Sequence, residues 1–96
     1  MQVEHHYEAR GDVLEAAEWY ESQREWLGLQ FLQAFDAAVA IVAEAPERWP
    51  ELREGVRRYH MRRFPYAIQY RIDSDRLLIL TVKHHMRHPD FGSERK

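Results

Sequence analysis

Cationic and imidazole side chains gather in the C-terminal half of this 96-residue chain, where together they could act on a phosphate. The cations that could neutralise phosphate charge are Arg58, Arg62, Arg71, Lys83 and Arg87. His84 or His85 could move protons, because imidazole has an ordinary pKa of about 6.5, close to neutral pH. Metal-independent cleavage of RNA needs these residue types.

A metal site is a second interpretation of the same segment. His84 and His88 are four residues apart, which would place both on one face of a helix. However, Pro89 follows directly, a strand-like pattern precedes, and Asp90 is the only nearby carboxylate. We therefore expect neither a metal ion nor a cofactor, and no glycine-rich phosphate loop is present.

Charge is segregated along the chain. Residues 1–54 contain 4 Arg and 12 Asp or Glu, which gives −8, and residues 55–96 contain 10 Lys or Arg and 4 acids, which gives +6. This segregation predicts a basic surface for an anionic partner, either nucleic acid or an acidic protein segment. In the alternative interpretation, the two halves neutralise each other within the fold.

Length and composition indicate one soluble domain covering residues 1–96, with residues from about 85 to 96 as a flexible or partner-ordered tail. The absence of cysteine excludes disulfides, thiolate metal sites and cysteine nucleophiles, and it fits a cytoplasmic location. The sequence gives no support for membrane insertion or secretion.

Hydrophobic periodicity predicts the elements that would position these residues. A weak strand near Val3 precedes an amphipathic helix over 9–23, and a more apolar helix runs from Gly28 to about Ala45. The period then changes to two, which predicts strands over 56–63, 66–72 and 76–84. The expected fold is therefore α+β, with the order β-α-α-β-β-β. Trp19, Trp26 and Trp49 would either stack on bases or, in the favoured interpretation, pack around the hairpin and linker.

Several short sequence motifs, taken in this order, resemble those of toxins of the RelE/ParE superfamily of bacterial type II toxin–antitoxin modules. They cover nearly the whole chain, and they are Glu15-Ala16-Ala17-Glu18-Trp19-Tyr20, Leu27-Gly28-Leu29-Gln30-Phe31-Leu32, Ala45-Pro46-Glu47-Arg48-Trp49-Pro50, Arg62-Arg63-Phe64-Pro65-Tyr66 and Arg87-His88-Pro89. The resemblance implies a helical hairpin on one face of a mostly antiparallel sheet, inhibition of growth, plasmid stabilisation, and a neutralising antitoxin encoded nearby.

The two branches of the superfamily imply different activities. The RelE branch implies ribosome-dependent mRNA cleavage, with Arg62, Lys83, His84 and Arg87 as the candidate catalytic set. That branch typically keeps a tyrosine near its C-terminus and a dense set of lysines and arginines. The matching position here looks like Phe91, which has no hydroxyl, and the only lysines of the chain are Lys83 and Lys96.

The motifs of the ParE branch match this chain better than those of the RelE branch. Resemblance to the ParE branch implies direct binding and inhibition of DNA gyrase without catalytic residues. Arginine and aromatic side chains are favoured anchors in such interfaces. The candidate residues for binding the target or the antitoxin are Arg57, Arg58, Arg62, Arg63, Arg71, Arg87 and Phe91. Any one of these cations could instead be an ordinary solvated charge, and a protein that has lost its toxicity is a third interpretation.

Overall fold

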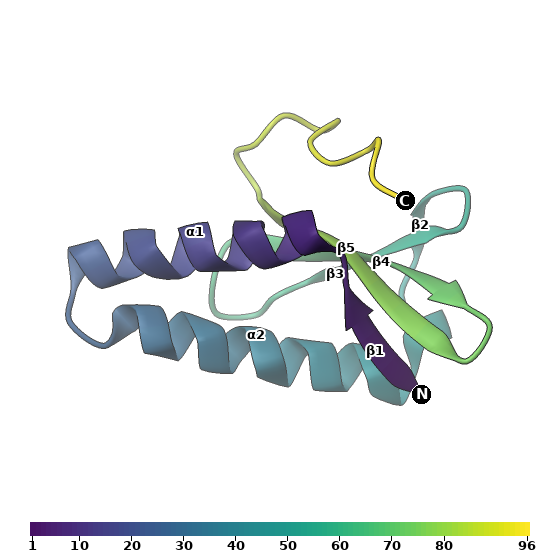
Figure 1. The fold of residues 1–96 in the computed structure, drawn as a ribbon, viewed down its shortest axis with the longest axis horizontal. Helices are drawn as coiled ribbons and strands as arrows, with labels where there is room; N and C mark the ends of the chain where they lie inside the picture. The colour runs from purple at the N-terminus through teal and green to yellow at the C-terminus, as the bar shows by residue number, and fades with distance from the viewer.

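The computed structural model describes residues 1–96 as two helices packed on one sheet (Figure 1). Strand β1 is followed by the two helices, a single 3-10 turn (η1) and four further strands. The bounds are β1 Gln2–His5, α1 Tyr7–Gln23, α2 Leu27–Glu44, η1 Pro46–Arg48, β2 Glu51–Arg53, β3 Val56–His60, β4 Tyr66–Asp73 and β5 Arg76–His84.

The five strands form one mixed sheet in the order β1-β5-β4-β3-β2. β1 pairs with β5 in parallel, and all other neighbours are antiparallel. The expected α+β class and helical hairpin are confirmed. The expected strand count omitted β2, whose three residues are too few to show a period of two.

Two predicted boundaries differ from the structure. The helix expected from residue 9 begins at Tyr7, because the Nδ1 atom of His6 accepts a hydrogen bond from the Glu8 N–H and caps the first turn. The strand expected over 56–63 ends at His60, since residues 61–65 form the bend that returns the chain into β4.

The turn between the helices depends on Glu21. Its carboxylate accepts hydrogen bonds from the backbone N–H groups of Trp26 and Gly28, at 3.1 and 3.0 Å. These two groups lie at the start of α2, where backbone donors have no partner within the helix. At Gly28 an added Cβ would lie 2.5 Å from the Ala17 carbonyl oxygen, so the absence of a side chain allows the helices to approach closely.

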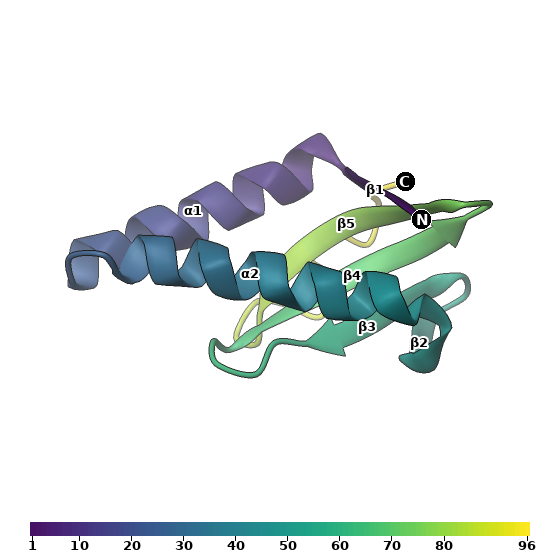
Figure 2. The same cartoon turned by 90° about the horizontal axis from the view of Figure 1, so that it is seen from below.

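The core lies between the hairpin and one face of the sheet. α2 crosses that face, while the C-terminal tail lies on the opposite side of the sheet (Figures 1 and 2). The rings of Tyr20, Phe31 and Phe64 lie within 5.4 Å of one another between their centroids and join the helices to the 61–65 bend. α2 is long and apolar enough to cross a membrane by length and composition alone, and core helices of soluble proteins share this property.

The segment from His85 to Lys96 contains no helix or strand, but it folds back along β5. The Arg95 side chain is only 5% exposed and reaches both Asp12 of α1 and the Leu80 carbonyl of β5. Gly92, with φ of +79°, lies directly against Thr81. Because the tail covers this part of β5, the apolar run in β5 is buried on both faces, as its composition predicted.

Candidate functional site

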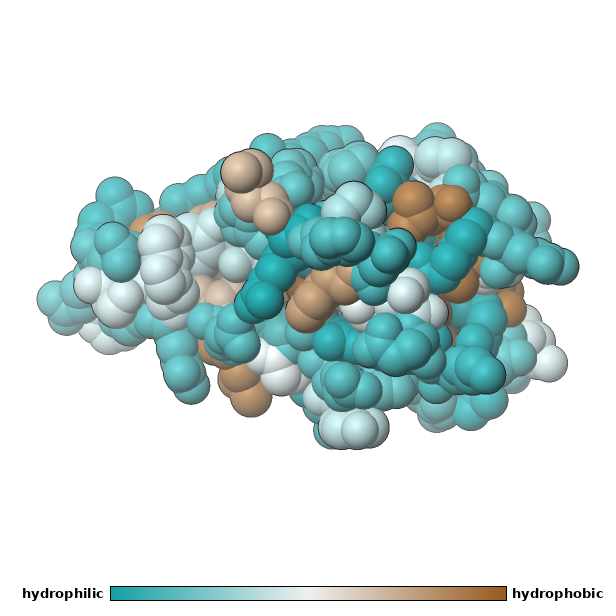
Figure 3. All heavy atoms as spheres, turned by 90° about the horizontal axis from the view of Figure 1, so that it is seen from above, coloured by the Kyte–Doolittle hydropathy of each residue, from teal (hydrophilic) through white to brown (hydrophobic).

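A cationic cleft lies on the face of the sheet that the helices leave uncovered. It has a volume of about 380 Å³, and no carboxylate is among its lining residues. The lining comes from four strands and the tail, namely Leu52, Arg58, His60, Ala67, Gln69, Lys83, His85, Arg87 and Pro89. Figure 3, which views the molecule from above, shows a mainly hydrophilic surface with separate hydrophobic spots.

Two histidines meet inside this cleft. The Nδ1 atom of His60 lies 3.3 Å from Nε2 of His85, and the two rings are nearly perpendicular. Burial lowers the pKa of His60 below its usual value, and the charges of Arg58, His85 and Lys83 lower it further. Arg58 and Lys83 therefore disfavour a further positive charge at His60.

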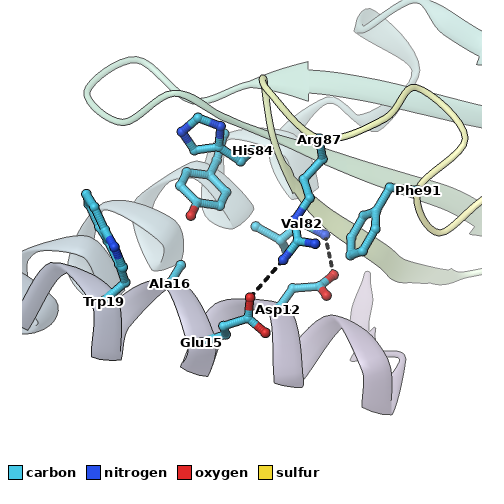
Figure 4. Close-up of a pocket in the computed structure, with 9 residues that line it drawn as sticks. Asp12, Glu15, Ala16, Trp19, Val82, His84, Arg87 and Phe91 are labelled. Atoms are coloured by element: carbon cyan, nitrogen blue, oxygen red, sulfur yellow. Dashed lines mark hydrogen bonds and ion pairs between the residues drawn. The ribbon is translucent and has the colours of Figure 1, made fainter.

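An aromatic groove lies on the other side of β5, between α1 and the start of the tail. It is lined by Trp19, Tyr20, Tyr66, His84, Met86 and Arg87 and has a volume of about 270 Å³. An adjoining cavity of about 110 Å³ extends toward Asp12 and Phe91 (Figure 4). Trp19 is 57% exposed and Met86 is 86% exposed, so this groove presents apolar side chains to solvent.

Arg87 lies between the cleft and the groove. Its guanidinium forms an ion pair with Glu15 of α1 at 2.8 Å and stacks over the Phe91 ring at 4.9 Å (Figure 4). The Arg95 guanidinium also lies over the Phe91 ring, 5.0 Å from its centroid. Both Arg87 and Phe91, chosen from the sequence, therefore lie at the border of an accessible surface.

His84 faces the groove rather than the cleft. Its ring packs edge-on against Tyr66 at 5.0 Å, and its Nδ1 atom accepts a hydrogen bond from the Met86 N–H. Burial lowers the pKa of His84, and the charges of His85, Lys83 and Arg87 add to the effect. The neighbouring Lys83 lines the opposite side of the sheet, so these two members of the candidate catalytic set lie on different surfaces.

Other predicted binding residues are occupied within the fold. Arg57 donates hydrogen bonds to the carbonyls of Glu47 and Trp49 and also pairs with Glu51, so it fixes the link between η1 and β2. Arg71 pairs with Asp73 at 3.7 Å.

The two arginines of the 61–65 bend lie on the helix side of the sheet. Arg63 donates a hydrogen bond to Gln30 of α2. Arg62 is exposed and lines a separate small groove beside α2 with Ala34 and Tyr59. Arg62 therefore does not join Lys83 and Arg87 at the cleft.

The comparisons decide the family. The model of the "ParE toxin of type II toxin-antitoxin system, parDE" family matches residues 3–89. The chain belongs to the ParE toxin family. A solved structure described as "Chromosomal ParDE TA system from P. aeruginosa" is similar to this ParE-family chain, with a TM-score of 0.79 and 18% sequence identity over 88% of this chain and 95% of that one. No curated protein matches its sequence.

In this ParE-type toxin, ion pairs neutralise some of the basic side chains, while others remain without a carboxylate partner. Five arginines of the C-terminal half have a carboxylate within 4 Å, namely Arg57, Arg71, Arg76, Arg87 and Arg95, but only Arg87 and Arg95 pair with a helix. Arg58 and Lys83 have no such partner, and both line the cationic cleft. The helices therefore neutralise part of the basic half and leave the cleft cationic.

Some residues of the two surfaces were not selected from the sequence of this ParE-family chain. His60 and Gln69 are absent from the predicted site, although alternation along a strand would place His60 on the same face as Arg58. Trp19 and Trp26 were expected to be packed, but they are 57% and 63% exposed. Trp49 is the packed member, with its ring against Tyr59 at 4.6 Å.

Proposed function

We propose that this ParE-type toxin acts in the cytoplasm, where it inhibits DNA gyrase by direct binding and is neutralised by a cognate antitoxin. The separation of His84 from Lys83 and of both from Arg62 carries the proposal. General acid–base catalysis needs its groups within hydrogen-bonding reach of one substrate. Cations spread over several surfaces suit recognition of a large partner.

The surface offered to gyrase is the cleft and its border at Arg87 and Phe91. Arg58 and Lys83 have no carboxylate partner, so binding would not first have to break an ion pair at these positions. Arg87 would exchange the exposed Glu15 carboxylate for an acidic group of the partner, at little net cost because exposed ion pairs contribute little.

The antitoxin is assigned to the aromatic groove. An amphipathic helix or added strand binds through apolar anchors, and Trp19 and Met86 offer an exposed apolar surface for them. An acidic side chain beside those anchors could pair with Arg87, which lines the same groove. Because Arg87 also lines the cleft, an antitoxin bound in the groove would compete with gyrase at this residue.

Purified toxin tests the gyrase proposal in a supercoiling assay. We expect inhibition by the wild type, about tenfold weaker inhibition by Arg87→Ala, and wild-type inhibition by the control Arg76→Ala. Truncating an interface side chain that contributes to binding costs more than about 1 kcal/mol, and about 1.4 kcal/mol corresponds to a tenfold change in affinity. Adding the product of the adjacent gene should restore supercoiling. Full gyrase activity at saturating toxin would overturn the proposal.

A ribosome-dependent mRNA endonuclease is the second candidate, because one observation favours it. The His60–His85 pair lies among cations without a competing carboxylate, and paired imidazoles can supply an acid and a base. Mapping of mRNA ends in a translation extract tests this function. Cleavage that disappears in both His60→Ala and His85→Ala would establish it.

A further inference from the structure

We propose that the cationic cleft binds the sugar-phosphate backbone of double-stranded DNA. This inference goes beyond inhibition of gyrase, since it concerns DNA in the absence of any other protein. Six donors converge on the cleft, and they are Arg58, His60, Gln69, Lys83, His85 and Arg87.

The spacing of the cations suits a chain of phosphates. Arg58 on β3 pairs with Gln69 of β4, and Lys83 on β5 pairs with Ala67 of β4, so the two cations lie on strands either side of β4. Strands are about 4.8 Å apart, which puts the two backbones about 10 Å apart across the sheet. A DNA strand carries a phosphate about every 3.4 Å of helix axis, so the cleft spans more than one phosphate.

The chemistry of the lining favours a backbone over an acidic peptide. An amphipathic peptide needs apolar pockets for its anchors, and here only Leu52, Ala67 and Pro89 are non-polar. The exposed apolar side chains Trp19 and Met86 lie instead in the aromatic groove. Phosphate contacts need only cations and N–H donors, which the cleft provides without a carboxylate.

The same lining favours duplex DNA over single-stranded RNA. Recognition of unpaired bases depends on aromatic platforms, and the only rings in the cleft are those of His60 and His85. These two rings lie nearly perpendicular to each other, with their nitrogens 3.3 Å apart, so they do not form one continuous platform for successive bases. Binding would therefore be independent of base sequence.

The histidine pair makes the binding dependent on pH. The groups facing it are Arg58 on β3, Lys83 on β5 and Arg87 in the tail, all of them cations. Protonation of His60 adds a positive charge, and a bound phosphate favours that charged form. Because burial and the neighbouring cations lower the pKa of His60 in the free protein, the affinity for DNA should rise mainly as the pH falls toward 6 and below, by up to about tenfold for one added contact.

Fluorescence anisotropy with a labelled 20-base-pair duplex and the full chain tests the proposal. We expect a Kd in the micromolar range at low salt, roughly 1–100 µM. Arg58→Gln and Lys83→Gln should each weaken binding about tenfold at 0.1 M salt and reduce the salt slope by about one. The control Arg76→Gln removes the same charge from a residue that pairs with Glu4 outside the cleft, and it should change the affinity by less than about twofold.

Each alternative outcome overturns the proposal in a different way. Equal losses in the cleft variants and in Arg76→Gln would show attraction by net charge alone. Tighter binding of a single-stranded RNA of equal length, or displacement of the duplex by polyglutamate at lower concentration than by unlabelled DNA, would assign the cleft to another partner. A pH dependence that persists in the double variant His60→Gln/His85→Gln would remove the histidine pair from the mechanism. Because gyrase is absent, failure of the gyrase proposal leaves this test intact.

Discussion

Arg95, the penultimate residue, forms an ion pair with Asp12 of α1 at 2.6 Å, with both side chains almost fully buried. Asp12 also accepts a hydrogen bond from the Val82 N–H at 3.0 Å, and Arg95 donates to the Leu80 carbonyl. One carboxylate thus connects the first helix, strand β5 and the tail. This contact holds the tail, and therefore Arg87 and Phe91, in place beside the cleft.

Replacing Asp12 with alanine should destabilise the fold strongly. The variant would leave the buried Arg95 guanidinium with only the more exposed Glu8 carboxylate, 3.7 Å from its Nε atom, and would leave the Val82 N–H without the Asp12 acceptor. Removing one partner of a buried ion pair lowers the free energy of unfolding by about 3–5 kcal/mol. The loss cannot exceed the free energy that docks the tail, because an undocked tail exposes the Arg95 guanidinium to water. Urea denaturation measures the loss, and Arg76→Ala, which breaks an exposed pair, should cost at most about 1 kcal/mol. Equal costs would contradict a structural role for the buried pair.

The two helical glycines should respond to alanine with opposite signs. Gly11 lies inside α1 with no heavy atom within 4 Å of an added Cβ, so Gly11→Ala should stabilise the protein by about 1 kcal/mol through helix propensity. Gly28→Ala places a Cβ 2.5 Å from the Ala17 carbonyl oxygen and should destabilise the protein by about 1–3 kcal/mol. Thermal unfolding followed by circular dichroism separates the two, and stabilisation by both substitutions would mean that the helices separate freely at Gly28.

The architecture could be predicted because its main elements show a clear hydrophobic period. Alternation over Tyr66–Ile72 identified β4 to within one residue of its end, and the continuous apolar run identified β5 as a strand buried on both faces. β2 could not be found in this way, because its three residues are too few to show a period of two and its pairing with β3 is a backbone contact. The tail packing was also hidden, since Arg95 and Asp12 are 83 residues apart and no local pattern connects them.

The residue types of the site were predictable, but their grouping was not. Lys83 and His84 are adjacent in sequence, yet successive side chains of a strand point to opposite faces, so they enter different surfaces. His60 and His85 come together because β3 and β5 flank β4, an arrangement that depends on strand order rather than on sequence spacing. Charge segregation predicted a basic surface but could not show which arginines the fold itself would neutralise.

Alkaline pH should destabilise the protein through Tyr70. This side chain is fully buried, its hydroxyl donates to the Pro46 carbonyl at 2.6 Å, and burial raises its pKa to about 12. The native state therefore holds the phenolic proton after the unfolded chain has released it near pH 10, and stability falls as the pH rises from 10 toward 12, by about 3 kcal/mol for two pKa units.

Unfolding free energies measured between pH 9 and 11.5 test this dependence. Tyr70→Phe should lower stability by about 1 kcal/mol at pH 8, through loss of the hydrogen bond to Pro46, and should make the alkaline decline shallower. Part of the decline should remain, because burial also raises the pKa of Tyr20 and of Tyr66. An unchanged alkaline decline in Tyr70→Phe would show that its hydroxyl is already ionised or exposed in the native protein.

Antitoxin binding should depend on Trp19 far more than on Trp26. Both indoles are more than half exposed, but Trp19 lines the aromatic groove whereas Trp26 lies at the turn between the helices, outside it. Loss of a central aromatic anchor costs about 2–4 kcal/mol, so Trp19→Ala should weaken binding of the adjacent gene product by roughly 30-fold or more, and Trp26→Ala by less than about twofold. Isothermal titration calorimetry on the folded variants measures both. The two substitutions remove the same side chain from similarly exposed sites, so each serves as a control for the other. A similar loss of antitoxin affinity in both variants would place the antitoxin outside the aromatic groove, and it would then no longer compete with gyrase at Arg87.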